Sequence, residues 1–334
     1  MSLKICIIRT QYERVTKHNF DVFARLFAEC GFEVTETFSQ KEMFREKYDY
    51  YLASDLTTAW KLIRRGKRFF YWMQGIAPEE SRMAGKPGYH FLVWSFLEKK
   101  IVRKTLRLFT VSREMIRHLE KKYRVDLSHK SSVFPCYNTT LHKDSFFSEN
   151  KYENNVFVYA GGLSPWQCFD EIVDVYKSVE ERHPDVSLLL LARDRERAEA
   201  TAKEKSVKNY LIDYVSESEL DARLAVAKFG FIIRRDDPVN NVATPTKISS
   251  YLSNGIIPIF TSAIKDFTAQ TEGKKYVLRY DDESFSDRLE ELLAEKIDPN
   301  GIYEEYRTFF EEYYNDGKYL ADFKREIEGI IGNE

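Results

Sequence analysis

The chain has 334 residues, of which 43% are hydrophobic and 31% are charged, with 51 basic and 53 acidic side chains. This length predicts roughly two domains of about 100–200 residues each, and the apolar content excludes a disordered chain. The near balance of charge excludes a global field that would attract nucleic acid, and apolar runs such as Leu188–Ala192 are far too short to span a bilayer.

The first part of the chain alternates between strand and helix patterns. Leu3–Ile8 is a short apolar run, apolar residues recur at helical spacing over Asn19–Cys30, and Phe32–Thr35 resumes a strand. Later strands are predicted at Tyr48–Ala53, Arg68–Trp72, Leu108–Val111 and Val133–Pro135, with helices at Phe91–Lys104 and Arg113–Tyr123. This β-α-β opening is typical of a doubly wound sheet.

The polar segment Thr139–Asn155 has no periodicity, and we interpret it as a linker. The alternation then restarts, and the apolar segment Val186–Ala192 is typical of a strand buried on both faces of a parallel sheet. Strands are also predicted at Asn155–Ala160, Tyr210–Ile212, Gly230–Arg234 and Ile256–Phe260. Helices are predicted at Phe169–His183, Glu196–Ser206, Glu217–Ala227, Lys247–Ser253, Ser284–Leu293, Tyr303–Tyr314 and Lys318–Ile331.

We therefore predict two α/β domains, one over residues 1–145 and one over residues 151–310. Residues 311–334 are predicted to form a C-terminal helix, and one hypothesis is that this helix packs back on the first domain. Two such domains leave a cleft between them, and parallel sheets bind ligands outside the carboxyl ends of their strands.

Neither the cysteines nor the histidines are spaced as metal ligands. Cys6, Cys30, Cys136 and Cys168 show no C-x-x-C pattern, so we predict no disulfide framework and no zinc site. We expect no bound cofactor and no metal. Because the first strand begins at once, without the pattern of a signal peptide, the expected location is the cytoplasm.

The segment Ala243–Phe260 has the residues that suit a phosphate. Pro245 fits the first turn of a helix, Thr244 is placed to cap that helix, and Lys247 adds a full charge to its first turn. A helix N-terminus offers unpaired N–H groups and a partial positive charge. The segment therefore predicts a phosphate site, with ordinary helix capping and a solvated lysine as the alternative.

Other residues at predicted strand ends add to this site. Arg234 and Arg235 end the strand that precedes it, and arginine forks match phosphate oxygens. Arg193 follows the strand Val186–Ala192, with a solvated loop as the alternative. The pair Gly161 and Gly162 would let the backbone approach a ligand, although βα turns use glycine in any case. Asp236 and Asp237 are not spaced as D-x-D, and they can equally neutralise the two arginines.

Residues 245–259 contain Pro-x-Lys, a predicted helix, and then Tyr-Leu-x-x-Gly-x-x-Pro-Ile. This arrangement resembles the donor-domain signature of GT-B glycosyltransferases of the family-4-like type (glycosyl transferases group 1), in which it binds the nucleotide and diphosphate of an activated sugar. Four further segments resemble the family in the same order, namely Phe70–Ala77, Leu108–Glu114, Val133–Asn138 and Val156–Gly162. The resemblance therefore covers most of residues 1–310.

The resemblance implies two Rossmann-like doubly wound domains that face each other across a cleft. It implies retaining, metal-independent transfer of a sugar from a nucleoside diphosphate sugar to a glycan or lipid-linked acceptor. We expect Arg234 and Lys247 to act in catalysis by stabilising the diphosphate leaving group. The candidate donor-binding residues are Gly161, Gly162, Arg193, Arg235, Thr244, Pro245, Thr246 and Ser250. The acceptor-side candidates are Trp72, Gln74 and His18.

The chain also departs from the family pattern. Many relatives have two glutamates eight positions apart, and the corresponding residues here are Val242 and Ser250. The second glutamate holds the ribose hydroxyls in that family. The alternative function is therefore a catalytically inactive or specialised nucleotide-sugar-binding protein on the same fold. A dehydrogenase is disfavoured, because no G-x-G-x-x-G follows either opening strand.

The segment Phe91–Arg107 mixes aromatic residues such as Trp94 and Phe96 with five lysines and arginines. A basic, aromatic amphipathic helix can lie on an anionic membrane, which would suit an enzyme that extends a lipid-linked sugar. The alternative is a Rossmann helix that packs its apolar face on the sheet. Peripheral membrane contact is thus one hypothesis for this chain, whereas nucleic acid is not an expected partner.

Overall fold

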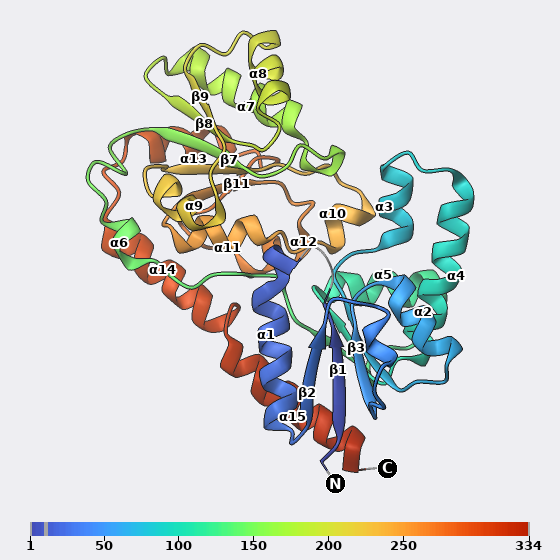
Figure 1. Ribbon diagram of the computed structural model, residues 1–334. Coiled ribbons are helices and arrows are strands. Elements are labelled where there is room, and N and C mark those ends of the chain that lie inside the picture. The colour runs from blue at the N-terminus through green and yellow to red at the C-terminus, as the bar shows by residue number, and fades with distance from the viewer. Residues whose placement is uncertain (1, 10–12, 333–334) are drawn as a thin grey trace. The chain divides into compact units, whose positions relative to one another are not determined.

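The computed structural model describes residues 2–9 and 13–332, and these form two units, each built around a six-stranded sheet (Figure 1). Unit 1 takes in the chain as far as Asn138, the short segment Asn241–Thr244, and the chain from Tyr314 onward. Unit 2 takes in Thr139–Asn240 and Pro245–Tyr313. The chain therefore passes from one unit to the other several times.

Unit 1 has a fully parallel sheet in the order β2-β1-β3-β4-β5-β6. Its strands are β1 (Lys4–Ile8), β2 (Glu33–Thr37), β3 (Tyr50–Ala53), β4 (Phe69–Met73), β5 (Leu108–Thr110) and β6 (Ser131–Val133). Its helices are α1 (Glu13–Glu29), α2 (Leu56–Arg64), α3 (Ala77–Met83), α4 (Gly88–Lys104), α5 (Arg113–Tyr123) and α15 (Asp316–Gly332). The five strands and three helices predicted along residues 3–123 are all confirmed, with shifted ends.

Two helices of unit 1, α2 and α3, are absent from the sequence interpretation. The first begins after Asp55, whose carboxylate accepts a hydrogen bond from the backbone N–H of Thr58 at 2.9 Å. An aspartate in this position is a standard helix N-cap signal, so the start of this helix is visible in the sequence. The second is a seven-residue helix with Pro78 in its first turn.

The core of unit 1 is aromatic and joins both ends of the chain. Phe23 of α1 packs against Trp72 of β4 and Phe109 of β5, with ring centroids 5.6 and 5.0 Å apart. Phe323 of α15 packs on Phe109 from a centroid distance of 4.9 Å. Helix α15 lies beside α1, as Figure 1 shows in red and blue. Burying such large rings supplies much of the driving force for folding.

Unit 2 has a second fully parallel sheet, in the order β12-β11-β10-β7-β8-β9. The strands are β7 (Val156–Ala160), β8 (Ser187–Leu191), β9 (Tyr210–Asp213), β10 (Phe229–Ile232), β11 (Ile257–Phe260) and β12 (Leu278–Arg279). The helices are α6 (Lys143–Phe146), α7 (Phe169–Arg182), α8 (Arg195–Glu204), α9 (Glu217–Leu224), α10 (Pro238–Val242), α11 (Thr246–Ser253), α12 (Lys265–Gln270), α13 (Phe285–Ala294) and α14 (Pro299–Glu312). The direction of strand addition reverses between β7 and β10, and the crevice at such a point is where doubly wound sheets bind ligands.

The polar segment 139–155, interpreted above as a linker, is an ordered part of unit 2. His142 donates its backbone N–H to the carbonyl of Ser253 at 2.9 Å, and the Tyr152 hydroxyl donates to the carbonyl of Gly255 at 3.0 Å. The segment therefore packs against the end of α11. Its lack of periodicity reflects irregular backbone held by long-range hydrogen bonds.

Two lysines of unit 2 are buried without a carboxylate partner among the described residues. The Lys151 ammonium donates to the carbonyl of Ala225 at 2.8 Å, and the Lys228 ammonium donates to the Asn155 side chain at 3.0 Å. Burial lowers the pKa of Lys151 to about 7 and that of Lys228 to about 8.

We expect stability to rise as the pH increases from 7 to 9. The folded pKa values lie below the usual lysine value, so over this range the unfolded chain binds more protons than the folded chain. Each lysine contributes a slope of at most about 1.4 kcal/mol per pH unit. Thermal unfolding measured from pH 7 to 9 should show that the stability of Lys151→Met rises less steeply with pH than that of the unchanged chain. Lys203→Met, at an exposed lysine of α8, is the control, and an equal slope in Lys151→Met and the unchanged chain would contradict the assignment.

Candidate functional site

The strand-order reversal in unit 2 places Gly161 and Arg234 at neighbouring strand ends. Gly161 follows β7 with φ at +142°, a conformation that side chains rarely adopt, and its N–H donates to the carbonyl of Leu191 at 2.9 Å. Arg234 lies two residues beyond the end of β10. Both residues are therefore at the carboxyl edge of the sheet, where a ligand is expected.

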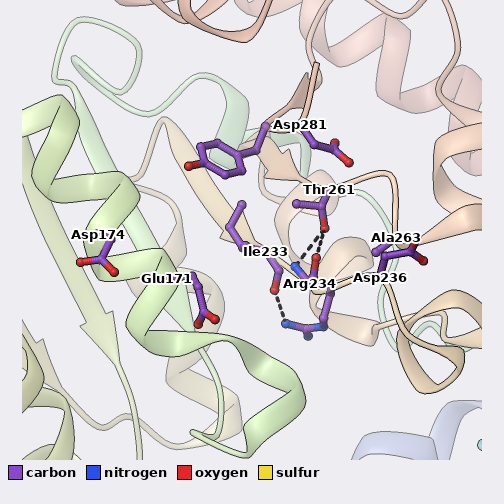
Figure 2. A pocket seen from close by; sticks show the side chains of 9 residues that line it. Glu171, Asp174, Ile233, Arg234, Asp236, Thr261, Ala263 and Asp281 are labelled. Carbon is purple, nitrogen blue, oxygen red and sulfur yellow. Dashed lines mark hydrogen bonds between the residues drawn. The ribbon is translucent and has the colours of Figure 1, made fainter. Parts of the chain in front are cut away.

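Arg234 is held firmly, with only 5% of its surface exposed. Its backbone N–H donates to the Thr261 hydroxyl at 2.9 Å, and that hydroxyl donates back to the Arg234 carbonyl at 2.7 Å (Figure 2). Its guanidinium donates to the backbone carbonyl and the side-chain oxygen of Gln167, at 3.1 and 2.7 Å. No carboxylate pairs with it in the described chain, and burial lowers its pKa.

Lys247, in the first turn of α11, contacts the same side-chain oxygen of Gln167. Its ammonium lies 3.2 Å from the Gln167 side-chain oxygen and 3.8 Å from the centroid of the Tyr159 ring. A Cβ atom on Gly161 would stand only 3.1 Å from this ammonium. Burial, together with the charge of Arg234, lowers the pKa of Lys247 well below its ordinary value.

The resulting cluster (Gly161, Gln167, Arg234 and Lys247) contains two cations that share one uncharged oxygen. Neither cation forms an ion pair with a carboxylate anywhere in residues 2–9 or 13–332. A buried positive charge without a partner is costly, and a bound anion would relieve that cost. The cluster is therefore suited to phosphate oxygens.

Helix α11 is held in place by a contact between glycine and tyrosine. A Cβ atom on Gly230 in β10 would lie 2.6 Å from the ring of Tyr251, so only glycine leaves room for that ring. The Tyr251 hydroxyl accepts a hydrogen bond from the backbone N–H of Ala160 at 2.9 Å. The helix is thus fastened to both strands that meet at the cluster. Glycine within a strand often marks such a close approach, and this signal was missed.

The predicted start of α11 needs correction. The helix begins at Thr246, Pro245 is its N-cap, and no side chain caps it. The Thr244 hydroxyl instead accepts a hydrogen bond from the backbone N–H of Cys136 at 3.0 Å, inside unit 1. Thr244 is therefore not the helix cap, because a long-range partner takes its hydroxyl. Ser250 is 9% exposed and lies within hydrogen-bonding distance of the Thr246 carbonyl, at 3.4 Å.

The remaining charged candidates lie outside the cluster. Arg235 is largely exposed and forms an ion pair with Glu171 of α7. Arg193 is exposed and makes no ion pair with a described residue. Asp237 accepts a hydrogen bond from the backbone N–H of Asn240 at 3.0 Å, in the first turn of α10. Gly162 is exposed, and its carbonyl accepts a hydrogen bond from the Tyr159 hydroxyl.

Arg234 also lines a cavity of about 370 Å³, whose lining residues Figure 2 shows. The acidic residues that line it are Glu171, Asp174, Asp236 and Asp281. Arg234 is the single cationic residue among those lining it, and neither Lys247 nor Gly161 takes part. Three of these carboxylates form ion pairs, Glu171 with Arg235, Asp174 with Lys205 and Asp236 with Lys265. The cavity is therefore separate from the cluster of Arg234, Lys247, Gln167 and Gly161, with which it shares only Arg234.

The three acceptor-side candidates in unit 1 lie in different surroundings, namely the core, a cavity and a contact with α15. Trp72 has no exposed surface and packs edge-on against Phe20 at 5.2 Å, so its side chain is unavailable to an acceptor. Successive strand residues face opposite sides of a sheet, and Trp72 is on the core side with α1. Gln74 lines a cavity of about 300 Å³. His18 contacts Asp316 of α15, with its Nε2 atom 2.9 Å from the carboxylate.

Within the described ranges, no group of three or more His, Cys, Asp or Glu side chains is arranged to hold a metal ion. All four cysteines are free. None of the described helices combines the length and the apolar character needed to cross a membrane.

No protein-family model matches this sequence, and no curated protein matches it. Solved structures do match it. Sucrose-phosphate synthase from Thermosynechococcus elongatus superposes with a TM-score of 0.76 at 11% identity, over 99% of this chain and 100% of that chain. An alpha-glucosyltransferase in complex with UDP and DNA gives a TM-score of 0.65 at 13% identity, over 98% of this chain and 100% of that one.

A further match is an α,α-trehalose-phosphate synthase (UDP-forming) from Burkholderia xenovorans in complex with glucose-6-phosphate. Its TM-score is 0.61 at 12% identity, over 96% of this chain and 83% of that chain. These structures are GT-B glycosyltransferases, and the predicted GT-B fold of two doubly wound α/β domains is thereby confirmed.

Proposed function

We propose that this protein is a glycosyltransferase that moves a sugar from a nucleoside diphosphate sugar to an acceptor. One observation carries the proposal, namely that Arg234 and Lys247 share the uncharged oxygen of Gln167 beside Gly161, without a carboxylate counter-ion. Two such cations at the strand-order reversal of a doubly wound sheet favour a diphosphate. The GT-B fold supports this proposal, because one of the solved structures with the same fold is an alpha-glucosyltransferase in complex with UDP.

The chemistry follows from where charge develops. When the bond between the sugar and the diphosphate breaks, negative charge grows on the diphosphate oxygens. Fixed cations that are already in place stabilise this charge, since they need little reorganisation in a poorly solvated site. Arg234 and Lys247 would hold the leaving group, and Gly161 would let the backbone approach it. We propose that the reaction proceeds with retention of configuration and without a metal.

The alternative is a nucleotide-sugar-binding protein that does not catalyse transfer. It is favoured by Ser250 and Val242, which stand where relatives of the resembled family have glutamates. Ser250 is almost fully buried, and the Val242 carbonyl accepts a hydrogen bond from the Ser112 hydroxyl at 2.7 Å. Neither residue supplies a carboxylate for ribose, so another group would have to bind the ribose hydroxyls.

Thermal-shift measurements with UDP, GDP, dTDP, ADP and CMP test the ligand class, because a ligand that binds the folded state raises its stability. We expect at least one nucleoside diphosphate to raise the midpoint. The corresponding nucleotide sugar should then be hydrolysed slowly, or transferred when a glycan acceptor is added. Binding without hydrolysis or transfer to any acceptor would favour the alternative. No response to any nucleotide would contradict both functions.

We further propose that the acceptor is a glycan or a lipid-linked sugar and that unit 1 touches membranes. Helix α4 exposes four large apolar side chains, which are Tyr89, Leu92, Val93 and Phe96. Near its C-terminal end it also exposes the basic residues Lys100, Arg103 and Lys104. An exposed apolar face next to positive charge favours a surface of anionic lipid.

Co-sedimentation with vesicles tests this membrane contact. We expect binding to vesicles that contain anionic lipid, weaker binding to neutral vesicles, and loss of binding in Leu92→Asp. The control is Leu211→Asp, which changes a similarly exposed leucine of β9 in unit 2. If neither vesicle type sediments the protein, or if both variants behave alike, the contact is excluded.

A further inference from the structure

A second cavity lies within unit 1, at the carboxyl edge of its sheet, and encloses about 300 Å³. Ser54 follows β3 and Gln74 follows β4, so polar residues at the ends of two neighbouring strands line this cavity. Trp94 of α4 and Ala77 at the start of α3 also line it. The cavity is therefore built from residues of one unit, on the sheet face opposite to Trp72.

Two hydroxyl groups of this cavity have no hydrogen-bond partner among residues 2–9 and 13–332. Tyr71 is only 3% exposed and lines the cavity, yet its hydroxyl makes no hydrogen bond to any described residue. The Ser54 hydroxyl likewise makes none with these residues and is buried, whereas the Tyr71 hydroxyl reaches the cavity. Because polar groups in folded proteins are almost always hydrogen-bonded, these two hydroxyls leave hydrogen-bonding capacity for a ligand with such groups of its own.

The charged residues that line the cavity are both acidic. The Glu80 carboxylate folds over Gly75, into space that a Cβ atom would occupy, and it forms no ion pair within the described chain. Burial and the charge of Glu98 raise the pKa of Glu80. Asp55 already caps α2. No lysine, arginine or histidine is among the lining residues, so a phosphate group would meet uncompensated negative charge.

A hydroxyl-rich ring matches this lining. Its hydroxyls can donate to Glu80 and accept from Tyr71, and Gln74 offers both a donor and an acceptor. Trp94 also lines the cavity, and aromatic side chains suit the apolar C–H face of a sugar. The same acidic lining would also tolerate an amino group on the ring.

We propose that this cavity binds one phosphate-free sugar ring, neutral or amino-substituted, of the acceptor. Tyr71 and Glu80 are the residues that select it, the first by donating a hydrogen bond and the second by excluding phosphate. The acceptor role rests on the glycosyltransferase function proposed above, whereas the binding of the ring does not.

Ligand-observed NMR titration of the full chain tests this proposal. The probes are glucose, mannose, galactose and glucosamine, each compared with its 6-phosphate. We expect at least one unphosphorylated sugar to bind about tenfold or more tightly than its phosphate. Tyr71→Phe should weaken that binding by about 2- to 10-fold, the range for one neutral hydrogen bond. Glu80→Gln should reduce the discrimination against the phosphate, and Tyr210→Phe, on β9 of unit 2, is the matched control.

The outcomes separate this proposal from the proposed function. Tighter binding of a 6-phosphate, binding of no sugar in the panel, or unchanged binding in both Tyr71→Phe and Glu80→Gln would overturn it. Each variant is also titrated with the nucleoside diphosphate that stabilises the unchanged chain, and that response should persist. Sugar binding without any nucleotide response would support the cavity while contradicting the glycosyltransferase function.

Discussion

Lys247→Ala is expected to weaken the binding of a nucleoside diphosphate by about 10- to 150-fold, because a hydrogen bond to a charged group contributes about 1.5–3 kcal/mol. Binding of the free nucleoside should change little, since the ammonium lies with Arg234 at Gln167, where phosphate oxygens are expected. Isothermal titration with both ligands measures the difference. Transfer or hydrolysis of the nucleotide sugar should fall at least as far.

The control for this prediction is Lys203→Ala, which removes an exposed lysine of α8 that pairs with Glu199. Its affinity for the diphosphate should match that of the unchanged chain. If Lys247→Ala weakens the diphosphate and the free nucleoside equally, the lysine is not a phosphate ligand. Unfolding midpoints for both variants show whether the fold is kept.

Proton uptake gives a second readout of the same change. Burial lowers the pKa of Lys247 in the free protein, and a bound diphosphate would raise it again by supplying negative charge. The complex should therefore take up protons at a pH above the pKa of the free lysine, and affinity should fall as the pH rises. Titration in buffers of different ionisation enthalpy measures this uptake, which Lys247→Ala should reduce.

Gly255→Ala is expected to destabilise unit 2 by about 2–5 kcal/mol through two independent effects. Gly255 has φ at +70°, which is unfavourable for a residue with a Cβ atom. An added Cβ atom would also lie 2.6 Å from the Tyr152 hydroxyl and 2.8 Å from the Phe146 ring. Because Gly255 lies two residues beyond the end of α11, next to its C-cap Asn254, the helix that carries Lys247 should be displaced as well.

Gly273→Ala separates the two effects. Gly273 has a similar φ of +76°, but nothing lies within 4 Å of its missing Cβ atom. It should therefore show only the backbone cost, about 1–2 kcal/mol. Denaturant or thermal unfolding of both variants measures the difference, and equal losses would show that the contacts with Tyr152 and Phe146 yield without cost.

Most of the strands and the longer helices could be predicted in order from the sequence, because they depend on local periodicity, whereas β12 and short helices such as α3 and α12 could not. Short apolar runs such as Val186–Ala192 and helical spacing such as Asn19–Cys30 indicate the βα alternation wherever they occur. A parallel arrangement then follows, because each crossover helix returns the chain to the same end of the sheet. The Pro-x-Lys start of α11 was likewise visible, and its lysine does lie in the first helical turn.

Only the tertiary structure decided which of the predicted polar groups remain available. Arg235 is neutralised by Glu171, and the Thr244 hydroxyl is taken by Cys136, partners 64 and 108 positions away in sequence. Arg234 and Lys247 instead meet at an uncharged glutamine. Charge balance and hydrogen bonding depend on neighbours that folding brings together, whereas periodicity depends on neighbours along the chain. The sequence alone therefore determined the architecture of this protein, and long-range packing determined where its unpaired cations lie.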